Sequence, residues 1–149
     1  MEKLIFDTGI KEFEVNGKGV LRFNPADPNV YARFMDMSDK IRTVEKDLAE
    51  RAQKLDDADN ETRGAETLRI MRIADEKMKS LLAEVFGAEN DFDQIFEGIN
   101  LMAVASNGER VISNFYTAIE PVIMSGVQAC VAEEVAEAKL NREQRRAMQ

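Results

Sequence analysis

The side chains that could do chemistry are carboxylates and a single thiol, because the chain has no histidine. The lack of histidine excludes histidine general bases, Ser-His-Asp and Cys-His nucleophile systems, and most zinc and iron sites. The eight glycines are scattered and form no phosphate-binding loop. Carboxylate pairs such as Glu133 and Glu137 share a helix face, but nothing in the sequence builds a cleft around them. We therefore expect a non-enzymatic binding or assembly protein with no cofactor and no metal.

One acidic stretch, residues 56–64 (DDADNETRG), invites comparison with a calcium-binding loop because its carboxylates recur at a spacing of two. Such a loop needs glycine at its sixth position and glutamate at its twelfth. Counted from Asp57, those positions hold Thr62 and Leu68, so the comparison fails. The stretch is predicted to be a turn whose acidic residues favour the N-terminus of the next helix.

The single thiol, Cys130, excludes an internal disulfide and favours a reducing compartment. Val127, Val131 and Val135 accompany it on a predicted helix. No histidine exists to activate the thiol, and no cationic residue is close to it in sequence. Cys130 is therefore interpreted as a small buried apolar residue rather than as a reactive group.

A long amphipathic helix over residues 28–55 organises the chain. Its apolar residues recur at steps of three and four, which places them on one stripe of an α-helix. They are Val30, Phe34, Met37, Ile41, Val44, Leu48, Ala52 and Leu55. The helix would be roughly 40 Å long at 1.5 Å per residue, so its stripe needs another helix or another molecule as a partner.

Residues 3–24, before this helix, are predicted to be β structure that includes the apolar run 4–6. Asn16-Gly17 marks a hairpin turn within the loop 16–19, because both residues tolerate a positive φ. An isolated hairpin is marginal in water, so this one either caps the helices or offers an edge to a partner's strand. Capping is the simpler interpretation. Asp27 and Pro28 are predicted to be the N-cap and first residue of the long helix.

The rest of the chain is predicted to be helical. A second amphipathic helix over 66–86, ended by Gly87, would form an antiparallel hairpin with the first. A short helix over 92–96 and a last helix from 109 or 110 to 140, kinked by Pro121, complete the pattern. The fold class is thus mainly α (α+β), with one domain over 1–140. It divides into a β-hairpin region (1–26), the helical hairpin (27–87) and C-terminal helices (88–140), followed by a basic, flexible tail (141–149).

Charge and hydropathy narrow the class of partner. The formal net charge is −8, which disfavours nucleic acid and anionic membranes as partners. The basic segment 142–146 leaves nucleic-acid contact as a weaker alternative. The sequence shows no signal peptide, and no apolar run approaches the ~20 residues of a membrane span. A cytoplasmic location is expected.

Three segments together resemble the small tail assembly chaperones of long-tailed bacteriophages, in the versions from phages of Gram-positive hosts. The first is FEVNGKGVLRFNPADPNVYARF (13–34), a hairpin leading into the long charged helix. The second is LLAEVFGAENDFDQIFEG (81–98), followed by VISNFYTAIEPVI (111–123). The third is the basic LNREQRRAMQ (140–149). They span most of the chain, and none is a catalytic signature.

The resemblance implies a role in virion morphogenesis without enzymatic activity. Such chaperones bind the long, aggregation-prone tape-measure protein and help recruit tail-tube subunits in the host cytoplasm. A chaperone of this kind needs an apolar groove in an acidic, soluble body. We expect that groove between the kinked last helix and the segment 92–102. Its candidate partner-binding residues are Phe92, Phe96, Ile99, Leu101, Phe115 and Ile119. The alternative interpretation is that most of them belong to the hydrophobic core. The alternative is a structural or regulatory protein that forms homo-oligomers through its long helix.

Overall fold

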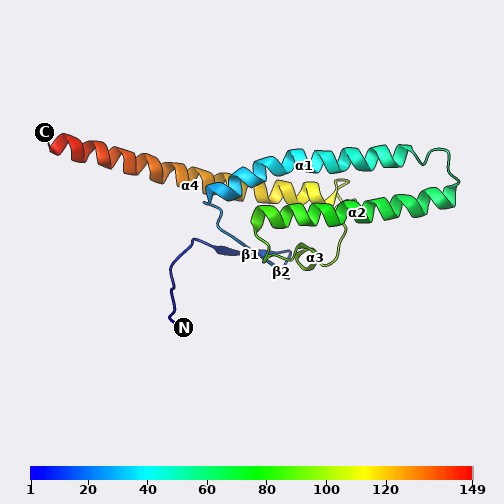
Figure 1. Ribbon diagram of the computed structural model, residues 1–149, viewed down its shortest axis with the longest axis horizontal. Coiled ribbons are helices and arrows are strands. Elements are labelled where there is room, and N and C mark those ends of the chain that lie inside the picture. The colour runs from blue at the N-terminus through cyan, green and yellow to red at the C-terminus, as the bar shows by residue number, and fades with distance from the viewer. Residues whose placement is uncertain (149) are drawn as a thin grey trace.

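The computed structural model describes residues 1–148 of the chain (Figure 1). An antiparallel hairpin comes first, formed by β1 (Lys11–Val15) and β2 (Gly19–Phe23). Four helices follow in the described part: α1 (Pro28–Gln53), α2 (Asn60–Phe86), α3 (Phe92–Ile95) and α4 (Val111–Ala147). The predicted fold class, mainly α with an N-terminal hairpin, is therefore confirmed.

The two longest elements of the body, α1 and α2, run antiparallel, and the first half of α4 lies beside them (Figure 1). The N-terminal part of the α1 stripe is fully used within the chain, because Val30, Phe34, Met37 and Ile41 are buried. Phe34 also stacks on Tyr116 of α4, with 5.0 Å between ring centroids. The buried part of this stripe is therefore occupied within the chain, whereas Val44 and Leu48 further along it are only half-buried.

The hairpin caps the helices. Leu21 and Phe23 of β2 are buried, and Phe13 lies opposite Leu21 in the register. Phe23 makes an edge contact with Phe86 at the end of α2, with centroids 4.9 Å apart. Asn90 holds the strand in place, because its side chain accepts from the Arg22 N–H and donates to the Arg22 carbonyl, both at 2.9 Å. The hairpin thus rests on the helical core.

The first ten residues differ from the prediction. No strand forms in residues 1–10, and Leu4, Ile5 and Phe6 are among the most exposed apolar side chains. The reason is that pairing with β2 begins only at Lys11, so the residues before it meet no neighbouring strand. They form an extended arm that leaves the body (Figure 1).

The second helix begins earlier than predicted, inside the acidic stretch 56–64. The helix begins at Asn60, and Asp59 caps it by accepting from the Thr62 N–H at 2.7 Å. Arg63 closes the turn by donating to the Leu55 and Ala58 carbonyls at 3.1 Å each. Periodicity alone missed this first turn, because its residues carry capping groups instead of the apolar stripe.

α4 is one continuous helix that includes both the predicted kink position, Pro121, and most of the predicted tail. Pro121 lies inside it at an exposed position, where water can satisfy the carbonyl left without a partner. Residues 141–147 also continue the helix. They are rich in strong helix formers, and Arg145 and Arg146 lie favourably in the last turn. The part of the predicted tail that the structure describes is therefore helical as far as Ala147.

Candidate protein-binding surfaces

The six predicted partner-binding residues do not line a groove. Phe92, Phe96, Leu101 and Ile119 are buried, and Phe115 is half-buried. Only Ile99 is exposed. Phe115 of α4 belongs to an aromatic cluster with Phe86, Phe92 and Phe96. It meets Phe96 edge-on, with ring centroids 5.2 Å apart. The segment 92–102 and α4 are therefore packed against each other, and the predicted site is core.

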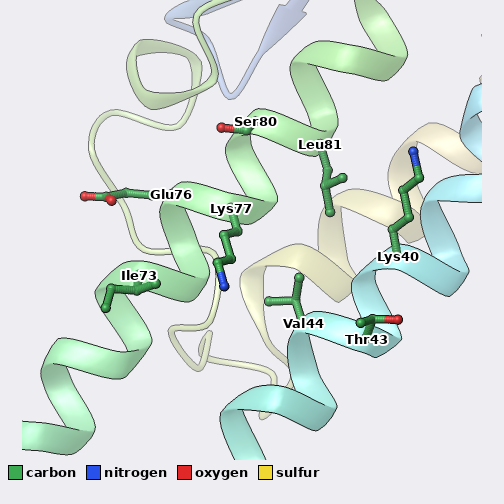
Figure 2. Close-up of a pocket in the computed structure, with 8 residues that line it drawn as sticks. All are labelled: Lys40, Thr43, Val44, Ile73, Glu76, Lys77, Ser80 and Leu81. Carbon is green, nitrogen blue, oxygen red and sulfur yellow. The ribbon is translucent and has the colours of Figure 1, made fainter.

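An open groove lies elsewhere, between α1 and α2 (Figure 2). Val44 of α1 and Leu81 of α2 point into the gap from opposite sides, and Ile73 extends the apolar lining along α2. All three are half-buried. The cavity volume is about 500 Å³. Its polar or charged lining residues are Lys40, Thr43, Glu76, Lys77 and Ser80.

The charged groups at the groove are held only loosely. Lys40 lies 3.5 Å from Glu84, and Lys77 lies 3.9 Å from Asp47. All four side chains are well exposed to solvent. Exposed pairs of this kind contribute about 0–1 kcal/mol, so they exchange readily for contacts with an incoming molecule. The groove thus offers an apolar floor with charges that can rearrange at its edges.

A sequence signal for this groove existed. The apolar set of α2 is too wide for one partner helix, since Ile70 and Ile73 lie beside the main stripe. In the structure the buried stripe consists of residues such as Ala74, Met78 and Leu82, whereas Ile73 and Leu81 remain at its edges. The width of the stripe therefore marked residues that the fold does not fully cover.

A polar cavity on the other side of α2 contains a charge network that sequence reasoning missed. Lys79 Nζ lies 2.9 Å from Asp75 Oδ2 and 2.7 Å from Asp93 Oδ1. Asp75 also accepts from the Leu101 N–H at 2.8 Å. The i,i+4 spacing of Asp75 and Lys79 was the available signal, but it resembles many solvent-exposed pairs.

The network is built to hold structure. Burial alone lowers the pKa of Lys79, but hydrogen bonds to Asp93 and Asp75 outweigh it and raise the pKa above the ordinary value. A lysine nucleophile or base needs the opposite shift. Lys79 therefore stays protonated and anchors the segment around Leu101 to α2.

Two further apolar surfaces are exposed. One is the N-terminal arm with Leu4, Ile5 and Phe6, and the other is the second half of α4. Cys130, expected to be buried, lies half-buried where α4 leaves the body. By length and composition alone, α4 is the one helix of the described residues that could span a membrane, although about a fifth of its most apolar stretch is buried within the protein. A single helix of this kind is weak evidence for a membrane location.

Comparisons of the chain with protein-family models, with curated proteins and with solved structures found no match.

Proposed function

We propose that the chain is a non-enzymatic tail assembly chaperone that binds an apolar helical segment of a tape-measure protein in the groove between α1 and α2. The observation that carries the proposal is this open, apolar-floored groove on an acidic body. The choice of a tape-measure protein as the partner rests on the three sequence segments that resemble phage tail chaperones. Tail-tube subunits, recruited to the same complex, are the second expected partner, and the host cytoplasm is the expected location.

The groove suits a helix rather than a strand. Helix-in-groove recognition uses apolar residues at helical spacing on the partner and an apolar floor between two helices. Val44 and Leu81 line the groove with apolar side chains, and the antiparallel helices α1 and α2 form its two sides. A strand would need unpaired backbone groups, which the hydrogen-bonded backbones of α1 and α2 do not offer. A long tape-measure helix with an apolar stripe matches these requirements.

Co-expression with a tape-measure protein from the same genomic neighbourhood tests the proposal. The wild-type chain is expected to keep the partner soluble and to be recovered with it. The double variant Ile73→Asp with Thr43→Arg places charge and bulk at the groove, and capture is expected to fall by more than about tenfold. Neither residue belongs to the buried core, so the variant is expected to fold.

The matched control places the same changes outside the groove. Leu68→Asp and Thr117→Arg alter one exposed residue of α2 and one of α4. This double variant is expected to capture the partner as the wild type does. Equal capture by the groove variant and the control would refute the groove as the site, and failure of the wild type to capture any tail protein would refute the function.

A further inference from the structure

The second half of α4 stands alone. From Val131 to Met148 every residue is exposed, while the helix continues unbroken to Ala147. The exposed residues 131–147 extend over roughly 25 Å at 1.5 Å per residue, and the end of α4 projects beyond the body (Figure 1). In proteins most of the stability of a helix comes from the packing of its apolar face.

That projecting segment carries an uncovered apolar face. Ile119 and Ile123 are buried against the body, and Val127, four residues further on, is half-buried. The same steps of four then reach Val131 and Val135, which are 55% and 62% exposed. Val131 and Val135, about one turn apart, thus form an apolar patch on the projecting segment that has no partner within the chain.

Charge along the segment determines what can cover this face. Residues 133–137 hold three glutamates and no base, whereas residues 139–146 hold one lysine, three arginines and one glutamate. The first block is therefore −3 and the second +3. Two such helices side by side in parallel would place like charges together, but in antiparallel orientation each acidic block faces the partner's basic block.

We infer that two copies of the chain pair antiparallel through the exposed residues 131–147 of α4 and form a two-fold symmetric dimer. The pairing is self-complementary, as a two-fold interface requires. With the axis near Ala138, Val131 of one copy lies level with Arg145 of the other, whose aliphatic stem can cover it. The two bodies lie at opposite ends of the paired helices, because each helix leaves its body in one direction (Figure 1).

Insertion of the projecting segment itself into a membrane is disfavoured by its charges. Eight of the fourteen residues from Glu133 to Arg146 are charged. Charged side chains within a bilayer are costly unless they face a polar interior. A second copy satisfies these charges, whereas lipid does not.

Sedimentation equilibrium of the full chain at micromolar concentrations tests the pairing. The wild type is expected to be a dimer that weakens as salt is raised. Val131→Asp with Val135→Asp is expected to weaken the dimer by more than about tenfold with no loss of thermal stability of the body. Leu68→Asp, an equally exposed apolar site on α2, is the control and is expected to remain dimeric.

A monomeric wild type, a dimer that survives the valine changes, or solubility that requires detergent would each overturn the inference. Because these valines lie far from the α1–α2 groove, the same variant is expected to capture a tape-measure partner normally. Loss of dimer and loss of capture are therefore separable outcomes.

A spin label on the native Cys130 can distinguish antiparallel from parallel pairing of the two α4 helices. In the antiparallel pair the two Cys130 residues are separated by about 16 residues along the axis, roughly 24 Å. In a parallel pair they would be adjacent. Pulsed electron spin resonance with a nitroxide on Cys130 is expected to give the long distance, and a short one would contradict antiparallel pairing.

Discussion

Asp75 Oδ1 accepts a hydrogen bond from the backbone N–H of Leu101 at 2.8 Å, across 26 positions of the sequence. The other oxygen of Asp75 pairs with Lys79 at 2.9 Å. One carboxylate therefore ties the irregular segment after α3 to the middle of α2. Leu101, at 0% exposure, lies in the core beside this contact.

Removal of Lys79 is expected to destabilise the fold strongly. Lys79→Met leaves Asp75 buried without its partner charge, and a loss of about 3 kcal/mol or more in the free energy of unfolding is expected. Urea denaturation measures this loss. Lys77→Met, two residues away and exposed, is the control and is expected to change stability by less than about 0.5 kcal/mol. Asp75→Asn in the Lys79→Met background is expected to restore part of the loss, and no restoration would contradict the pairing.

Gly126 is expected to tolerate no side chain. A Cβ at this position would lie 1.8 Å from the Pro25 carbonyl oxygen, where α4 crosses the junction before α1. Gly126→Ala is expected to cost about 1–3 kcal/mol of stability through forced displacement. Gly64, inside α2, meets nothing within 4 Å, so Gly64→Ala is expected to stabilise by about 0.5–1 kcal/mol. Thermal melts of the two variants that shift in the same direction would refute this packing.

The aromatic cluster is expected to behave as core. Phe92 is 3% exposed and packs against Phe86, so Phe92→Ala is expected to cost about 3–5 kcal/mol. Ile99 is 47% exposed, and Ile99→Ala is expected to cost far less. Melting followed by circular dichroism distinguishes them. If Phe92→Ala melts like the wild type but loses a partner, the residue belongs to a binding surface after all.

The start of α2 is expected to open in acid. The backbone N–H and the hydroxyl of Thr62 donate to Asp59, and these bonds hold the pKa of the Asp59 carboxyl below its ordinary value. A lowered pKa means that the stabilising effect is complete above the unfolded-state pKa of about 4 and is lost as pH falls through the lower folded value. The Thr62 amide resonance is expected to follow this titration. In Asp59→Asn the titration is expected to disappear, and a titration at the ordinary pKa in the wild type would contradict the bond.

Much of the fold could be predicted because its signals are local. The apolar period of α1, its Asp27 cap and the Asn16-Gly17 turn each act within a few residues, and the structure contains all three. Phe92, Phe96 and Leu101 were predicted to line a binding groove but are buried, because the apolar character of a residue does not tell whether it lies in the core or on the surface. That distinction depends on how α2, α4 and the hairpin meet, which is a long-range property.

The groove and the projecting half of α4 illustrate the same limit. Ile73 and Val131 both belong to predicted apolar faces, yet one lines a groove and the other faces water. The sequence shows that these faces exist but not how far each neighbouring helix reaches along them. The prediction of a strand in the N-terminal arm was wrong for the converse reason. Residues 4–6 are apolar like a strand, but no neighbouring strand lies beside them to pair with.

Site-specific photo-crosslinking in cells that also make a tape-measure protein tests the central proposal most directly. A photoreactive residue at Thr43 lies at the groove, and one at Thr117 lies on an exposed face of α4 as the matched control. We predict a crosslink to an apolar helical segment of the tape-measure protein from position 43 and none from position 117. Crosslinks of equal yield from both positions, or none from position 43 while the two proteins still purify together, would contradict the groove as the binding site.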